Sequence, residues 1–308
     1  MSVVATEAAS APAESAAVES PWRRFSAEFA ESKLALIGLA MLLAIVVVAL
    51  AAPVISPQNP YDLSQLDVLD SKLPPGEHSS TTGKPYLLGT DDQGRDMLSG
   101  IFYGIRISLF VGVTSTVIAL AIGLAMGLAA AYFGGWVDAI IMRIADIQLS
   151  FPAILIALVL LAVLGQGVDK IIFSLVTVQW AYYARTVRSS ALVERQKEYI
   201  EAAQVLALSR LRIVLRHLLP NCLPPLIVVA TVQVAHAIQL EAALSFLGLG
   251  LPITEPSIGL LISNGFQYLL SGKYWISFYP GLALLVTIMA INLVADQLRD
   301  ILNPRLKR

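Results

Sequence analysis

The sequence predicts an all-α membrane protein with six transmembrane helices. Of its 308 residues, 56% are hydrophobic and 14% are charged, whereas a soluble domain has about 45–50% apolar and about 25% charged residues. The apolar residues gather into blocks that approach or exceed the roughly 20 residues that a helix needs to cross a bilayer. Barrel strands would alternate in polarity over about ten residues, and runs such as VGVTSTVIALAIGLAMGLAA do not alternate. Because lipid offers no partner to open backbone groups, the spans are helices.

The predicted spans follow the apolar blocks, and the fourth is the shortest. Residues 171–184 reach spanning length only if Arg185 and Arg188 are included in the helix. The other blocks come close to the required length by themselves or exceed it. The six predicted spans are residues 34–55, 107–133, 147–165, 171–184, 223–240 and 279–295.

Basic residues indicate how these spans are oriented. Six spans place both chain ends on one side, and 15 of the 21 Lys and Arg residues then fall on that side. Positively charged loops stay in the cytoplasm, so the N- and C-termini are predicted to be cytoplasmic. Residues 57–104 then form a periplasmic insert with seven acidic residues, and residues 256–272 are expected to form a short interfacial helix in a second outside loop.

The first 20 residues, MSVVATEAASAPAESAAVES, are rich in Ala, Ser and Glu. A secretory signal peptide would begin with positive charge and continue with an apolar core. We therefore predict a disordered cytoplasmic tail over residues 1–20. Residues 21–308 form the transmembrane domain.

A charged segment, residues 190–222, lies between apolar blocks on the predicted cytoplasmic side. Two interpretations are open, namely an amphipathic helix on anionic headgroups or a docking element for a cytoplasmic protein. The sequence Glu201-Ala202-Ala203 favours docking, because two small residues beside one carboxylate allow close backbone approach. The pattern predicts two short helices joined by a turn, with Pro220 ending the second. The apolar stripes are Ile200, Ala203 and Leu206 (or Ala207), then Leu211, Val214 and Leu218.

The stretch EAAQVLALSRLRIVLRHLLPN in this segment resembles the cytoplasmic loop of ATP-binding cassette (ABC) importer permeases. Ala207 stands where that family usually has glycine, and Leu208 and Ser209 follow it. Glycine adopts a left-handed turn that alanine reaches only at a cost of about 1 kcal/mol, so the sequence allows the turn to differ here. The residues that match the family pattern are Glu201, Ala202, Ala203, Leu219 and Pro220.

This resemblance covers nearly the whole chain after residue 20 and narrows to dipeptide- and oligopeptide-type permeases. Segments similar to that branch are LLGTDDQGRDMLSGIFYGIRISLFVG (87–112), EAALSFLGLG (241–250) and PGLALLVTIMAINLVADQLRDILNPRLK (280–307). The long outside insert is typical of its C-type subunit. The resemblance implies the type I ABC importer permease fold and a multi-pass subunit, not an enzyme, that imports di- and oligopeptides across the cytoplasmic membrane.

The resemblance also implies partners. The cytoplasmic loop would insert into a cleft on an ATPase subunit, with the glutamate as an anchor. Two ATPase subunits would use ATP and Mg²⁺, a homologous second permease would complete the channel, and a periplasmic or lipid-anchored binding protein would deliver cargo. Membrane lipid would surround the chain, and no nucleic acid, metal or cofactor is expected on it. The fifth span lines the translocation path in this family, which makes His236 and Glu241 candidate path residues.

Other functions remain open. Importers of nickel chelates or glutathione share these motifs. A secondary transporter driven by an ion gradient is a further alternative, although such proteins often contain inverted repeats and none is found here. A membrane-embedded hydrolase would need His236 and Ser245 together, but nine residues along one helix separate them by about 13 Å.

Three features are interpreted as structural. Gly123 and Gly127 have the spacing that permits close helix contact. Arg143 and Asp146 lie three residues apart and are predicted to pair near the inner end of the third span. Cys222 is the single cysteine, so it excludes an internal disulfide and is interpreted as a small apolar filler.

Overall fold

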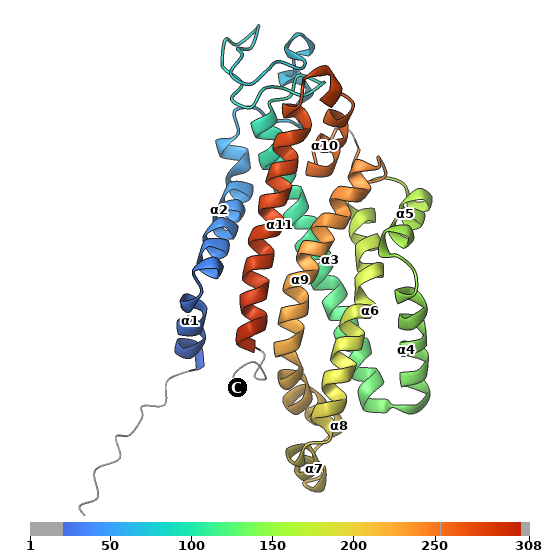
Figure 1. The fold of residues 1–308 in the computed structure, drawn as a ribbon. Helices are drawn as coiled ribbons and strands as arrows, with labels where there is room; N and C mark the ends of the chain where they lie inside the picture. The colour runs from blue at the N-terminus through green and yellow to red at the C-terminus, as the bar shows by residue number, and fades with distance from the viewer. Residues whose placement is uncertain (1–20, 253, 303–308) are drawn as a thin grey trace, which may run out of the picture.

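The computed structural model describes residues 21–252 and 254–302, and these residues fold into a long bundle of helices (Figure 1). Within these ranges there is no β-strand, only isolated bridges between loop residues. The predicted tail, residues 1–20, lies outside the described residues. The α-helices are α1 (Pro21–Glu31), α2 (Lys33–Ile55), α3 (Met97–Phe133), α4 (Gly135–Leu149), α5 (Ala153–Leu164), α6 (Val168–Arg195), α7 (Glu198–Val205), α8 (Arg210–Ile213), α9 (Leu219–Phe246), α10 (Ile258–Phe266) and α11 (Trp275–Leu302).

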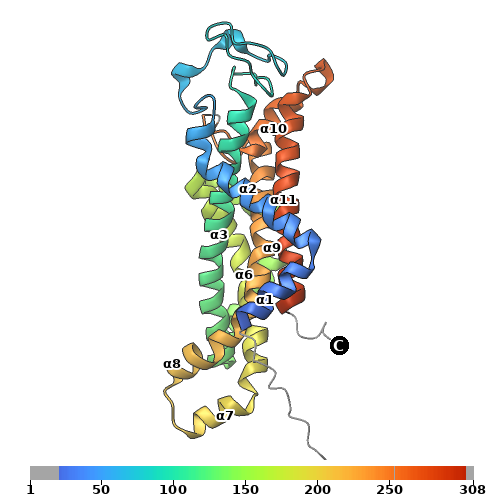
Figure 2. The same cartoon turned by 90° about the vertical axis from the view of Figure 1, so that its left-hand side faces the viewer.

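Residues 57–96, here called the cap, lie at one end of the bundle (Figures 1 and 2). The segment α7–α8 lies at the opposite end, and α1 and the end of α11 lie in the same half as α7. The short helix predicted within residues 256–272 is present as α10 and packs between α9 and α11. The two ends of the molecule therefore carry different elements, with the long helices between them.

Within the described part of the chain, four helical segments are long and apolar enough to cross a membrane, namely α2, α3, Arg210–Phe246 and α11. The pair α4 and α5 passes the same test jointly but bends by 90°, so the span predicted over residues 147–165 is not one continuous helix. The bend lies at Ser150–Pro152, because Pro152 has no N–H and disfavours helical geometry in the residue before it. α6 is a helix of 28 residues beside them, and it does not pass this test.

The most extensive helix contact among the described residues joins α3 and α6. The two glycines with the predicted packing spacing lie in it. A Cβ on Gly123 would lie 2.6 Å from the carbonyl oxygen of Trp180, and one on Gly127 would lie 2.5 Å from that of Ala184. Both separations are far shorter than van der Waals contact, so only glycine fits. The prediction of close packing is confirmed, and the two backbones approach directly.

Ion pairs hold α4 on α6. Asp146 pairs with Arg185, and Asp138 pairs with Arg188, whose Nη2 donates to Oδ2 at 2.6 Å. The predicted pair of Arg143 with Asp146 is wrong. Arg185 extends across the gap between the two helices and meets the Asp146 carboxylate there, so this carboxylate pairs between elements rather than within α4.

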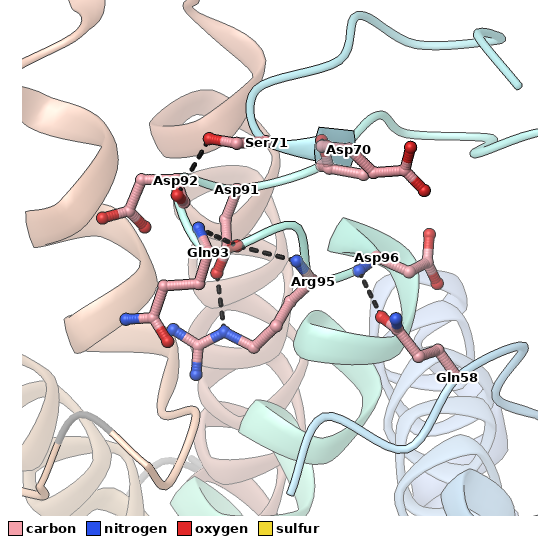
Figure 3. Close-up of polar contacts among 9 residues, drawn as sticks. Gln58, Asp70, Ser71, Asp91, Asp92, Gln93, Arg95 and Asp96 are labelled. Carbon is pink, nitrogen blue, oxygen red and sulfur yellow. Dashed lines mark hydrogen bonds and ion pairs between the residues drawn. The ribbon is translucent and has the colours of Figure 1, made fainter. Parts of the chain in front are cut away.

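A buried ion pair organises the cap at the start of α3 (Figure 3). Arg95 Nε donates to Asp91 Oδ2 at 2.7 Å, and the two side chains are 2% and 0% exposed. Asp91 Oδ1 also accepts from the backbone N–H groups of Gln93 and Arg95. A buried charge is tolerated when such hydrogen bonds replace its lost hydration. Asp96 then caps α3 by accepting from the backbone N–H of Ser99.

Several carboxylates of the cap are buried, although an acidic loop would be expected to expose its charges to solvent. Asp70, Asp91 and Asp96 are each at most 2% exposed, so these three of the seven acidic residues add no charge to the outer surface of the cap. Trp275 of α11 donates from Nε1 to the carbonyl oxygen of Thr90 at 3.2 Å. The cap is therefore attached to α11 as well as to α3.

One added methyl group at the α3–α6 contact should destabilise the fold. Gly123→Ala places its Cβ against backbone atoms of α6, and we expect the free energy of unfolding to fall by about 1–3 kcal/mol, the usual cost of overpacking. The matched control is Gly281→Ala on α11, where no atom lies within 4 Å of the new Cβ. Thermal unfolding in detergent measures both variants, and equal midpoints would contradict the close contact.

Candidate functional site

The α7–α8 segment is a helix–turn–helix, as the sequence predicts, and it projects from one end of the bundle (Figure 2). The predicted apolar stripes are not buried as units, because Leu206 and Leu211 are 73% and 68% exposed. The turn between the helices shifts the phase of the pattern, so that Ile213 faces inward instead. The buried cluster of the segment is Ile200, Ala203, Ile213 and Leu218.

Ala207 adopts the left-handed conformation that glycine favours, with φ 52°. Its N–H donates to the carbonyl oxygen of Gln204 at 2.9 Å, and the N–H of Leu208 donates to that of Ala203 at 3.2 Å. These two bonds are the pair that defines a Schellman motif, which ends a helix by satisfying its last carbonyl groups. Leu208 also packs on the cluster that contains Ala203. The left-handed turn that the sequence left in question is therefore present, with alanine in the strained position.

The outward side of the segment combines one carboxylate with an apolar tip. Glu201 and Ala202 are exposed, whereas Ala203 is buried. Among the described residues, the Glu201 carboxylate makes no hydrogen bond or ion pair. Ser209 and Pro220 are also exposed, and Leu208 and Leu219 are half-buried. The tip consists of Val205, Leu206 and Leu211, which are 85%, 73% and 68% exposed.

Polar contacts attach the start of α7 to α6 and α9. The Tyr199 hydroxyl donates to Glu194 Oε2 at 2.5 Å and accepts from Asn221 Nδ2 at 3.0 Å. Burial, followed by the bond to Glu194, raises the pKa of Tyr199 to about 12. Lys197 Nζ pairs with the other oxygen of Glu194 at 2.6 Å. Three separate helices thus meet at the base of the segment.

One continuous helical stretch, Arg210–Phe246, joins this segment to the interior of the bundle. The prediction that Pro220 ends the helix is wrong. A π-helical turn, Val214–Leu218, lies directly before Pro220, and such a turn rearranges the backbone hydrogen bonds that proline would otherwise interrupt. The predicted short second helix and the fifth span are thus parts of one continuous helix, here called the rod.

A hollow of about 400 Å³ lies between α5, α6 and α9. His236 is exposed and lines it. Three amide side chains and one phenol line it as well, and each of these can form hydrogen bonds. Sequence reasoning missed these residues, although glutamines within an otherwise apolar span are a usable signal. They are Gln179, Tyr182, Gln233 and Gln239.

Glu241 does not line this hollow. Its side chain is fully buried and accepts hydrogen bonds from Ser108 Oγ and Ser245 Oγ, each at 2.8 Å. The carboxyl group thereby connects α9 to α3. The hydroxyl of Ser245 is directed to Glu241, not to His236. Within the described residues, no group of three or more His, Cys, Asp or Glu side chains could hold a metal ion.

Comparison with known proteins assigns the chain to a family. The family described as "binding-protein-dependent transport system inner membrane component" matches residues 119–308, which is more than half of the chain. The chain belongs to this family. A second family, the N-terminal transmembrane domain of oligopeptide transport permease C, matches residues 20–75. The protein is therefore a multi-pass component of the inner membrane.

Relatives of this permease are similar over nearly their whole length. A putative peptide transport system permease protein of Brucella suis is 42% identical over 88% of each chain. The di/tripeptide transport system permease protein DppC of Pseudomonas aeruginosa is 37% identical over 94% of this chain and 93% of its own. The methionine ABC transporter MetNI in an inward-facing conformation has a similar fold, with a TM-score of 0.54 at 22% identity, covering 67% of this chain and 97% of the other.

Glycine should fit the strained turn better than alanine does. The left-handed conformation costs alanine about 1–2 kcal/mol, and glycine loses about 0.5–1 kcal/mol more backbone entropy on folding. We therefore expect Ala207→Gly to stabilise the α7–α8 segment by about 0.5–1 kcal/mol, measured as slower amide hydrogen exchange in α7. The control is Ala202→Gly inside α7, which should have the opposite effect. Faster exchange in Ala207→Gly would contradict the strain.

Proposed function

We propose that this chain is the C-type permease subunit of an ATP-driven importer of di- and oligopeptides. Two relatives described above and the family itself support this function, since those relatives are named as peptide permeases and the family is described as binding-protein-dependent transport. Two separate ATPase subunits would use ATP and Mg²⁺, and this chain would bind neither. A homologous second permease would supply the other half of the channel, and a periplasmic or lipid-anchored binding protein would deliver cargo.

The observation that carries the proposal is the α7–α8 segment. Its outward face has a carboxylate without a partner among the described residues, Glu201, beside the small residue Ala202, and its apolar tip leaves Leu206 and Leu211 in solvent. Exposed apolar side chains next to a fixed charge favour insertion into a protein cleft. A helix lying on lipid headgroups would direct its leucines to the membrane, whereas these are exposed on a segment that projects from one end of the bundle.

The orientation follows from this assignment. The α7–α8 end would lie in the cytoplasm with both termini, and the cap would lie in the periplasm, as the basic residues indicate. α6 would be the fourth of the six spans. Its Arg185 and Arg188 pair with α4 carboxylates, which lowers the cost of placing arginine near the membrane edge.

We infer that cargo passes along the hollow beside α9. Gln233 and Gln239 carry amide groups that both donate and accept hydrogen bonds, as peptide bonds do, so they would suit a peptide without selecting its side chains. His236 lies between them in sequence and in the same hollow. Glu241 would not contact the cargo, because it lies outside the lining of the hollow. It would instead hold α9 against α3. Force on the α7–α8 segment would reach these residues through the rod Arg210–Phe246.

Reversing the charge at Glu201 should uncouple transport from ATP. In membrane vesicles with the complete importer, we expect Glu201→Arg to lower ATP-dependent dipeptide uptake about tenfold or more, because an interface charge would face repulsion when buried. The control is Glu31→Arg, an exposed residue of α1 with the same charge change. Uptake that survives in Glu201→Arg at the level of the control would refute the coupling role. Uptake that needs a proton gradient and no ATP would instead support a secondary transporter.

Filling the hollow should block passage without affecting assembly. Ala243→Trp places a large side chain at its lining, and we expect uptake to fall while the importer purifies intact. The control Ala44→Trp adds the same side chain to an exposed site on α2, where it would face lipid. Normal uptake in both variants would place the path elsewhere.

A further inference from the structure

A second hollow, of about 640 Å³, lies between α2, α3 and the loop that precedes α10. It is lined by none of the residues of the hollow beside α9. Arg106 and Glu255 are its charged residues, and the phenol of Tyr61 is the third polar group. The remaining lining is apolar and comes mainly from the two long helices: Val46, Ala49, Leu50, Ile107, Leu109, Phe110, Val113 and Val168.

The charged part of this hollow lies at headgroup depth. Arg106 directly precedes the apolar block 107–133 of α3. α3 has 37 residues and is therefore about 55 Å long, which exceeds the roughly 30 Å of hydrocarbon. The first turns of α3 thus rise above the hydrocarbon together with the cap. Tyr61 belongs to the cap and contacts Tyr103 edge to face, with ring centroids 5.2 Å apart.

The apolar part of the hollow is open to the bilayer. Leu50, Phe110 and Val113 are 74%, 57% and 47% exposed, and they lie on helices long and apolar enough to span the membrane. Along α3, Phe110 and Val113 follow Arg106 by about one and two turns. The lining of the hollow is therefore charged at its mouth and apolar toward the membrane interior, in the same order as the headgroup and acyl chains of a phospholipid.

The two charges of the mouth are opposite but do not neutralise each other. Among the described residues, neither Arg106 nor Glu255 forms an ion pair within 4.0 Å. Both act on the same phenol: the pKa of Tyr61 is raised to about 12, mainly by burial and also by the Glu255 carboxylate, while Arg106 acts in the opposite direction. The mouth thus presents a cation and an anion around one hydroxyl group.

We propose that this hollow binds one zwitterionic phospholipid, phosphatidylethanolamine, with its phosphate at Arg106 and its ammonium group at Glu255. Guanidinium is the preferred partner of phosphate, and a primary ammonium group can donate to a carboxylate. A phosphatidylglycerol headgroup satisfies only Arg106 and meets repulsion from Glu255. The acyl chains lie along Leu50, Phe110 and Val113. This site depends on membrane insertion, not on coupling to ATPases or on the cargo.

The test is native mass spectrometry of this permease purified together with its partner permease, titrated with phosphatidylethanolamine or phosphatidylglycerol. We expect the wild type to bind one phosphatidylethanolamine more tightly than phosphatidylglycerol. Arg106→Gln and Glu255→Gln should each weaken phosphatidylethanolamine binding about tenfold, the effect of losing one charge-assisted contact. Lys84→Gln, an exposed residue of the cap, is the control and should leave binding unchanged. Arg106→Lys should bind with intermediate affinity.

Glu255→Gln separates charge complementarity from general lipid adhesion. Removing this carboxylate should reduce the preference for phosphatidylethanolamine, because phosphatidylglycerol no longer meets repulsion. Circular dichroism and size-exclusion profiles confirm that each variant is folded. The proposal is overturned if all variants bind the lipid as Lys84→Gln does, or if the wild type prefers phosphatidylglycerol. It is also overturned if the isolated chain binds the lipid and the permease pair does not, since the partner would then occupy the hollow.

Discussion

The direct approach of α3 to α6 is the constraint on which the rest of the structure depends. It requires two positions without side chains, Gly123 and Gly127, one turn apart. α6 then carries α4 through two ion pairs and provides the base of the α7–α8 segment. α3 carries the cap at its other end, where the buried pair of Asp91 and Arg95 fixes the entry into the helix. In lipid, where apolar surfaces gain nothing by associating, such close packing is a principal source of helix adhesion.

Polar groups in this permease differ in role according to whether they are buried or lie at a surface. Buried carboxyl groups are hydrogen-bonded: Asp91 by Arg95 and backbone N–H groups, and Glu241 by two serines. Such groups position elements and are withdrawn from solvent. Three surfaces present polar groups on the outside or in a hollow, namely the α7–α8 segment, the hollow with His236 and the hollow with Arg106. Under the proposed function these surfaces meet an ATPase, cargo and lipid, respectively.

The sequence was sufficient for features that depend on composition or local pattern. The apolar blocks located the long helices, and the small-residue spacing located the α3–α6 contact. It failed where the outcome depends on neighbours in space. Asp146 pairs across to α6 because Arg185 lies opposite, which spacing along α4 cannot reveal. Residues 147–165 are apolar on both sides of the bend at Pro152, so the hydropathy pattern could not reveal the bend. The four-residue turn around Ala207 resets the helical phase, and that reset exposes Leu206 and Leu211.

The unbroken stretch from Arg210 to Phe246 sets a rotational register as well as a length. Each residue of a helix turns the next by about 100°, so the direction of His236 is locked to the direction of Ile213 and Leu218 at the base of the α7–α8 segment. A single residue inserted between Pro225 and Gln233 would leave composition and hydropathy almost unchanged. It would nevertheless swing every side chain beyond it by more than a quarter turn, and the amides beside His236 would face a neighbouring helix in place of open space.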